Sequence, residues 1–176
     1  MNEPLPYRIA VLCYLFDERG RVLLLRRSRR PNRHLYSPVG GKLDVDIGES
    51  PTGCAVREIH EETGLLLNPQ KLHLTGVVSE AAYDRVHWLM FLYEVLGPVC
   101  VDRQDCDEGQ LAWHEPAQID QLQIPSTDRN VIWPLFWRYR GRFFMVHIDC
   151  RDEAMTWRIE QPAIDAERFH IPPVSG

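Results

Sequence analysis

Three carboxylates recur at helical spacing in the middle of the chain. Glu58, Glu61 and Glu62 stand at positions i, i+3 and i+4 of an expected helix, so they share one face within a single turn. Like charges at this spacing repel, and the helix dipole disfavours acids near its C-terminal end. A divalent cation would reverse these unfavourable terms, and carboxylate oxygens favour Mg²⁺ or Mn²⁺. The alternative interpretation is a solvated acidic face, the commoner meaning of clustered glutamates on a helix.

The flanking residues extend this pattern, with Glu49 one turn before the helix and Arg57 placed to pair with an acid. The whole run reads Glu49-x7-Arg57-Glu58-Ile59-x-Glu61-Glu62-x-Gly64-Leu65. It resembles the signature of the Nudix hydrolases, pyrophosphatases that cleave nucleoside diphosphates linked to another moiety. The match is complete from Glu49 onward. Upstream the family motif has Gly-x5-Glu, whereas two extra residues separate Gly41 from Glu49 here, which leaves the role of Gly41 open.

The resemblance implies a metal site and a set of catalytic groups. The implied metal ligands are Gly41, Glu49, Glu58, Glu61 and Glu62. Mg²⁺, or Mn²⁺ in its place, would neutralise the diphosphate and lower the pKa of an attacking water, so that hydrolysis needs no covalent intermediate. Glu58, Glu61 and Arg57 are the implied catalytic residues of the motif, Arg57 mainly by holding a carboxylate in place.

The identity of the general base stays open, because family members use different carboxylates. Glu108 resembles the late loop acid that completes some of these sites, and a plain surface turn explains it equally well. Glu80 is a weaker candidate.

Basic and aromatic residues supply candidate substrate contacts. Seven of the 18 arginines fall within residues 19–33, a stretch without acids. Guanidinium groups can bind phosphate bidentately, so Arg27 and Arg30 are predicted to contact substrate phosphates, although arginines on loops are commonly solvated. Tyr36 and Tyr83 are candidate platforms for base stacking. Trp88 is a third candidate platform, but it lies in an apolar strand and is expected in the core.

These residues must be positioned by a mixed α/β (α+β) domain in which strands outnumber helices. Ser50 as a cap, Pro51 in the first turn and Gly64 as a stop predict a helix over 51–62. The other expected elements are a hairpin of 8–16 and 21–26, a loop over 27–42, strands at 72–79, 86–96 and 111–114, a helix at 128–138 that Pro134 kinks or delays, and a closing hairpin of 142–150 and 155–161.

The order of these elements resembles the α/β/α sandwich of the Nudix family, built on a mixed sheet, over about residues 7–140. The resemblance therefore implies a Nudix hydrolase domain at 1–140. Residues 141–176 have no counterpart in that minimal core. They are expected to form a C-terminal β-hairpin extension packed on the same domain, so that the chain is a single domain overall.

Composition sets wider limits on function. The 176 residues, 44% of them hydrophobic, can form a full core, and the net charge of −5 disfavours general binding to nucleic acid or anionic membranes. Five cysteines without CxxC spacing suggest neither a disulfide framework nor a zinc site, and reduced thiols in a cytoplasm are the simplest account. The N-terminus lacks the features of a secretory signal, and no apolar run is long enough to span a bilayer.

Together these features predict a cytoplasmic, Mg²⁺-dependent enzyme that hydrolyses the pyrophosphate linkage of a nucleoside diphosphate derivative, such as a nucleotide sugar, a dinucleotide polyphosphate or a (d)NTP. One alternative is a catalytically silent Nudix-like module that binds a nucleotide and regulates a partner. The other is an RNA 5′-end pyrophosphohydrolase, for which only residues 19–33 offer a basic track. A homodimer is a further open point, and neither a membrane nor a nucleic-acid partner is expected.

Overall fold

The computed structural model describes residues 4–30 and 32–161, and their strands form two sheets. The larger sheet consists of β1 (Tyr7–Tyr14), β4 (Leu72–Tyr83), β5 (Val86–Val95), β8 (Phe144–Asp149) and β9 (Thr156–Gln161). Its strand order is β1-β5-β4-β8-β9. The smaller sheet consists of β2 (Val22–Arg27), β3 (Tyr36–Pro38), β6 (Asp105–Cys106) and β7 (Gly109–His114). Its order is β3-β2-β7-β6.

The larger sheet is mixed and the smaller one is antiparallel. β1 runs parallel to β5 and β4 parallel to β8, whereas β4 with β5 and β8 with β9 are antiparallel pairs. All pairs of the smaller sheet are antiparallel. β8 therefore belongs to the central sheet, because it pairs with β4 along its length.

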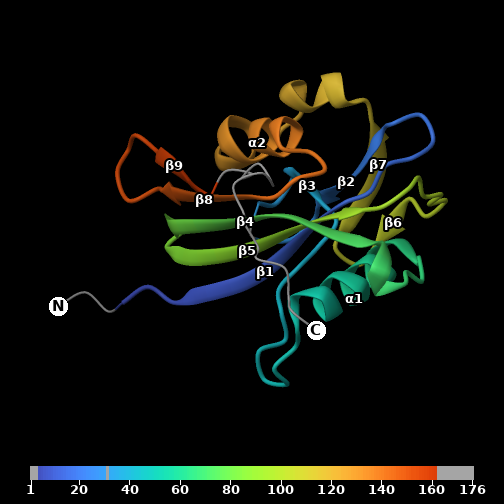
Figure 1. Cartoon of the computed structure of the whole chain (residues 1–176), viewed down its shortest axis with the longest axis horizontal. Helices are drawn as coiled ribbons and strands as arrows, with labels where there is room; N and C mark the ends of the chain where they lie inside the picture. Colours follow the sequence, from blue (N-terminus) through green and yellow to red (C-terminus); the bar gives the residue numbers. More distant parts are fainter. Residues whose placement is uncertain (1–3, 31, 162–176) are drawn as a thin grey trace, which may run out of the picture.

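The helical segments cover the two faces of the larger sheet. They are α1 (Pro51–Thr63), the short helices η1 (Pro69–Lys71) and η2 (Pro116–Gln121), the π-helix η3 (Asp128–Ile132) and α2 (Trp133–Arg138). α1 lies on one side of the sheet and α2 on the other (Figure 1). This arrangement confirms the predicted α/β/α sandwich with a mixed sheet. Within the described residues, no helix combines the length and the apolar character that a bilayer crossing requires.

β1 shows why both faces of the sheet are buried. Val11 and Cys13 are fully buried in the core beneath α1, where they pack with Ile59. Tyr14 lies in the opposite core and stacks on Phe136 of α2, with ring centroids 4.1 Å apart. Side chains alternate along a strand, so an almost continuous apolar run is what a strand covered on both faces needs.

The predicted hairpin of residues 8–16 and 21–26 is wrong as a unit of one sheet. Its turn is present, since Phe16 bridges Val22, but β1 and β2 then enter different sheets. One edge of β1 pairs with β5, and the other is bridged by Val39 and Lys42. Local sequence therefore predicts the turn, whereas long-range packing selects the partner of each strand.

The remaining elements match the sequence predictions with shifted ends. The helix at 51–62 and the closing hairpin are confirmed, and β4 and β5 cover the two strands predicted at 72–79 and 86–96. α2 begins one residue before Pro134, because proline is tolerated in the first turn of a helix. The predicted loop at 27–42 also contains β3. Residues 162–176 of the expected extension lie outside the described residues.

Candidate active site

The ends of α1 fix the position of the motif glutamates. The Ser50 hydroxyl accepts a hydrogen bond from a backbone N–H of the first turn at 3.0 Å, and Gly64 ends the helix in the left-handed conformation, with φ of 79°. Ile59 anchors the buried face of α1. Glu58 and Glu62 lie at the margin of that face and are only 7% and 2% exposed. Two acids are thus held in a setting that ordinarily suits apolar side chains.

Arg57 gathers the other carboxylates of the motif. Its Nε and Nη2 donate to the two oxygens of Glu49 at 2.8 and 2.9 Å. Its Nη1 lies 2.7 Å from Glu58 and 3.1 Å from Glu61. The hydrogen bonds from Arg57 lower the pKa of Glu49 to about 2. One guanidinium therefore touches three of the predicted metal ligands, in keeping with a positioning role.

Two glycines allow the backbone to approach these acids. The Gly40 N–H donates to Glu62 at 3.2 Å, and a Cβ on Gly41 would overlap the carboxylate of Glu58. Gly40 has φ of 147°, and any side chain there would also overlap the Val11 carbonyl. The Gly41 carbonyl accepts the Val11 N–H at 2.8 Å. Residues 39–42 therefore join β1 to the glutamates of α1.

The two extra residues upstream of Glu49 fit into a closed turn. The Glu49 N–H donates to the Asp44 carbonyl at 3.0 Å, and the Asp44 N–H donates to the Glu49 carboxylate at 2.9 Å. Residues 45–48 form an exposed turn between these two contacts. Gly41 consequently still meets Glu58, and the longer loop does not separate them.

Burial disfavours the charged forms of the acids at this site. It raises the pKa of Glu58, and it raises the pKa of Glu62 to about 8 with help from the charges of Glu58 and Glu108. Oε1 of Glu62 is buried without a hydrogen-bond partner among the described residues. A hard cation would satisfy that oxygen and offset the repulsion, so the donor set fits Mg²⁺ or Mn²⁺.

The side-chain positions place Arg57 where a cation would compete for the same oxygens. In the described part of the chain, no three acids, cysteines or histidines converge closely enough to hold a metal ion as they stand. A bound cation would therefore have to draw Glu58 and Glu61 away from the guanidinium of Arg57.

Glu108 and Arg27 reach the same region from distant parts of the sequence. β7 pairs with β2 so that Gly109 lies opposite Arg27, and the Ser28 hydroxyl donates to the Glu108 carbonyl at 2.9 Å. Arg27 Nη2 lies 2.9 Å from Glu108 Oε2. The charge of Glu108 contributes to the raised pKa of Glu62. Sheet pairing thus brings the predicted loop acid to the motif.

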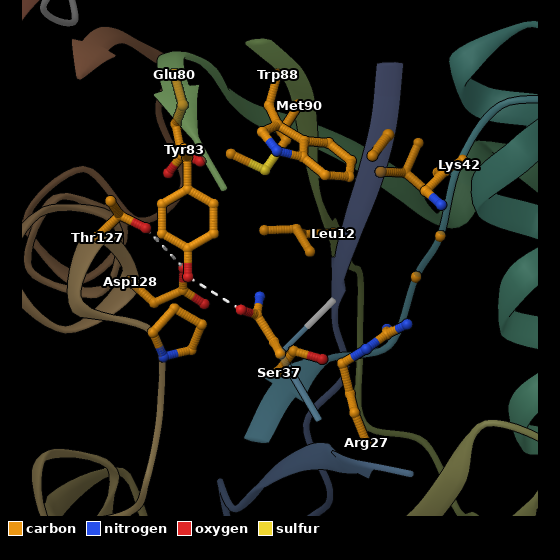
Figure 2. Close-up of a pocket in the computed structure, with 16 residues that line it drawn as sticks. Leu12, Arg27, Ser37, Lys42, Glu80, Tyr83, Trp88, Met90, Thr127 and Asp128 are labelled. Carbon is orange, nitrogen blue, oxygen red and sulfur yellow. Dashed lines mark hydrogen bonds between the residues drawn. The ribbon is translucent and has the colours of Figure 1, made fainter. Parts of the chain in front are cut away.

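A cavity lies on the face of the sheet opposite α1, and Figure 2 shows its lining residues. Leu12, Trp88 and Met90 supply apolar surface, and Tyr83 lies across from them. Arg27 and Lys42 lie at one end, with Ser37 beside Arg27, and Glu80, Thr127 and Asp128 lie at the other (Figure 2). Gly40 and Gly41 also line the cavity.

The four predicted substrate contacts are not all brought together. Arg27 and Tyr83 line the cavity, whereas Arg30 borders a shallow hollow beside Tyr83. Tyr36 packs edge-to-face on His114, with ring centroids 5.1 Å apart, and does not line the cavity.

Sequence reasoning missed Asp128 as a cavity residue, and for Trp88 it favoured the core over base stacking. Trp88 is buried, as expected, but it also forms part of the cavity wall. Asp128 opens an apolar helical segment, where an acid is ordinarily explained by the helix dipole, so no local signal marked it.

A family model described as the NUDIX domain matches residues 6–133. The chain belongs to the Nudix family. The match covers the motif helix, both glycines and the start of the segment that carries Asp128. Together with its relatives it identifies the chain as a hydrolase of the Nudix pyrophosphohydrolase class.

Relatives and solved structures agree with this assignment. The chain is 30% identical over 114 residues to the uncharacterized Nudix hydrolase YvcI of Bacillus subtilis. The aligned region covers 64% of this chain and 69% of YvcI. It is 41% identical over 80 residues to diphosphoinositol polyphosphate phosphohydrolase 3-alpha of Mus musculus, covering 46% of this chain and 44% of the mouse protein. The crystal structure of a MutT protein from Bacillus halodurans matches with a TM-score of 0.68 at 23% identity, covering 88% of this chain and 99% of that one. This last match shows a shared fold.

Proposed function

We propose that the protein hydrolyses the pyrophosphate linkage of a nucleoside diphosphate derivative: a nucleotide sugar, a dinucleotide polyphosphate or a (d)NTP. The observation that carries this proposal is the meeting of the motif glutamates with the Gly40–Gly41 segment, which also lines the cavity. A substrate lying in the cavity can pass its diphosphate over these glycines toward α1. Retention of every motif acid favours an enzyme over a silent binding module.

Mg²⁺, with Mn²⁺ as a substitute, is the proposed cofactor. The residues that would hold it are Gly41, Glu49, Glu58, Glu61 and Glu62. When bound, the ion would neutralise charge on the diphosphate and lower the pKa of an attacking water.

The chain's own side chains have separate proposed tasks. Arg27 and Lys42 line the cavity beside the glycines and bind phosphate oxygens. Arg30 and Tyr83 contact more distant parts of the substrate. Glu108 accepts the proton of the attacking water, because sheet pairing brings it beside the motif and its side chain is 38% exposed.

The cellular setting is proposed on the chemistry of the cysteines. All five are free thiols, which supports a reducing compartment such as the cytoplasm. Homodimer formation stays a prediction.

The proposal is tested by offering nucleotide sugars, ADP-ribose, dinucleotide polyphosphates and (d)NTPs to the protein with Mg²⁺ and separating the products. We expect release of a nucleoside monophosphate or of pyrophosphate that stops when EDTA is added. Glu61→Gln and Glu62→Gln should each lower turnover by about 100-fold, since they remove ligands of the ion. Glu153→Gln makes the same chemical change in an exposed turn and should leave turnover unchanged.

Near-normal Mg²⁺-dependent hydrolysis in both motif variants would overturn the assignment of the site. Failure of the wild-type protein on the whole panel would overturn the substrate class.

A further inference from the structure

Three polar side-chain atoms of the cavity lining are buried without any hydrogen-bond partner among the described residues. They are Oε1 of Glu80, Nε1 of Trp88 and Oγ of Ser37. Buried polar groups in native proteins are nearly always paired, so such groups mark places where a ligand or water completes the bonding. Glu80 is only 3% exposed and Trp88 only 8%. Together they offer a carboxyl group, an N–H donor and a hydroxyl to whatever enters the cavity.

Sheet register and the helical layer bring Glu80 and Trp88 together with a second acid. Glu80 on β4 lies directly opposite Trp88 on β5. Asp128, at the start of η3, is 9% exposed and comes from the layer that covers this face of the sheet. The Thr127 hydroxyl donates to Asp128 at 3.5 Å. Figure 2 shows Glu80, Thr127 and Asp128 on the same side of the cavity as Tyr83.

The two acids of this end form a pair with little negative charge. Burial raises the pKa of Glu80 to about 7 and that of Asp128 to about 8, and the charge on Glu80 contributes to the second. Neither acid forms an ion pair in the described part of the chain. A carboxylate at Glu80 can accept two adjacent N–H groups on its two oxygens, and a neutral carboxyl group at Asp128 would add a hydrogen-bond donor.

These properties select the chemistry of the occupant. The apolar surfaces of Leu12, Met90 and Trp88 suit a flat ring, and a lone carboxylate suits neighbouring N–H donors on its edge. A polyphosphorylated polyol would instead bring anions against Glu80 and Asp128, where like charges repel. Among nucleobases, guanine presents an N–H and an amino group side by side, next to a carbonyl acceptor.

The two ends of the cavity also define a direction. Arg27 and Lys42 lie at one end, away from Glu80 and Asp128 (Figure 2), and Gly41, the neighbour of Lys42 in the sequence, lies against the carboxylate of Glu58. A substrate with a diphosphate at the basic end would place its base at the acidic end.

We propose that Glu80, supported by Asp128 and Trp88, is the specificity-determining residue of this cavity and binds the donor edge of a guanine base in the substrate. The inference rests on the proposed function, since it assigns the base-binding part of the same site. It predicts that guanine nucleotides are preferred among the nucleoside diphosphate derivatives.

The test measures nucleoside binding to the metal-free protein, which is independent of turnover. Guanosine, inosine, adenosine and ribose are titrated in EDTA by calorimetry. Guanosine should bind at least about tenfold more tightly than adenosine or ribose, and inosine, which lacks the amino group, should lose about tenfold relative to guanosine. Glu80→Gln should abolish the difference between guanosine and inosine, because an amide cannot accept both N–H groups as a carboxylate does.

Matched variants keep the test interpretable. Asp128→Asn should also weaken guanosine binding. Trp88→Phe keeps an aromatic ring but removes the indole N–H and part of the ring surface, so it should weaken guanosine binding as well. Glu160→Gln, on the edge strand β9, makes the same change as Glu80→Gln outside the cavity and should bind guanosine as the wild type does. Thermal unfolding of each variant verifies that it is folded.

The outcomes separate this inference from the proposed function. Equal affinity for guanosine and ribose, or an unchanged guanosine affinity in folded Glu80→Gln, would overturn the inference even if Mg²⁺-dependent hydrolysis is found. Selective guanosine binding without hydrolysis of any nucleotide would support the base site and overturn the proposed function.

Discussion

Arg57 contacts Glu49, Glu58 and Glu61 at once, so each of these carboxylates is positioned by a single planar donor group. The contact with Glu49 uses two parallel hydrogen bonds, a geometry that a lysine ammonium cannot reproduce. The acids are therefore held around one guanidinium group although they repel one another.

We expect Arg57→Lys to lower Mg²⁺ affinity by about 10- to 100-fold while the protein stays folded, because the positive charge remains but the planar pair of N–H donors is lost. The measurement is the Mg²⁺ dependence of hydrolysis. Arg151→Lys alters an exposed arginine that pairs with Asp149 at the β8–β9 turn and serves as the control. Equal Mg²⁺ dependence in both variants would contradict the positioning role of Arg57.

The buried acids give the metal-free protein a pH-dependent stability. Glu62 has a pKa of about 8, above its value of 4.5 in the unfolded chain. Its contribution to the free energy of unfolding is therefore complete below pH 4.5 and is lost as the pH rises through 8. Glu80 and Asp128 act in the same direction, whereas Glu49, with a pKa of about 2, stays ionised in this range.

We therefore expect the Tm measured in EDTA to fall between pH 5 and pH 8. Glu62→Gln should make this decline shallower, because the amide does not ionise, and it should raise the Tm at pH 8. Mg²⁺ should stabilise the wild type more at pH 8 than at pH 5, since it binds the ionised acids. A Tm that is constant or rises with pH in EDTA would disprove the expected burial effect.

At the scale of elements, the site is a contact between α1 and the glycine segment beside β1. The helix could be predicted from local sequence because its cap, first turn and stop are all local signals: Ser50, Pro51 and Gly64. The pairing of residues 39–42 with β1 could not be predicted, because a short segment that contains glycines has no repeating apolar pattern from which a partner strand could be inferred. The same reason explains the mistaken hairpin, in which β1 and β2 share a turn but not a sheet.

Two substitutions should separate the stability of α1 from its approach to the glycine segment. Ser50→Ala should cost about 1 kcal/mol and lower the Tm by roughly 2–4 °C, with turnover retained, because the glutamates keep their neighbours. Gly41→Ala should leave the Tm nearly unchanged and lower turnover, because its Cβ displaces the Glu58 carboxylate. Thermal unfolding and steady-state kinetics on both variants test this, and full activity of Gly41→Ala would refute the close contact.

At the scale of the whole molecule, residues beyond the family match complete the central sheet. β8 pairs with β4, and its side chains Phe144, Val146 and Ile148 are fully buried in the core on the α2 side. Burying each such side chain contributes roughly 1.5–3 kcal/mol, a large part of the 5–15 kcal/mol that stabilises a typical domain. The proposed division at residue 140 therefore describes similarity to the family rather than an independent folding unit.

A chain ending at residue 141 should accordingly fail to fold, because β4 would lose a neighbouring strand. The core on the α2 side would also lose three buried side chains. A chain ending at residue 161 keeps every described element and serves as the control. Circular dichroism and solubility of the two chains provide the measurement. A cooperative unfolding transition in the shorter chain would show that the family core is independent of β8.

The sequence by itself determined the helix of glutamates, its caps, the family and the class of chemistry, because these depend on residue types at short fixed spacings. Only the tertiary structure showed that Glu108 reaches the motif from the turn before β7, that Tyr36 lies away from the cavity, and that Glu80 and Asp128 lie at the same end of the cavity. The physical reason is that sheet pairing and helix packing join residues dozens of positions apart. Burial, which gives those acids their altered pKa values, is a property of the packed molecule and of no single segment.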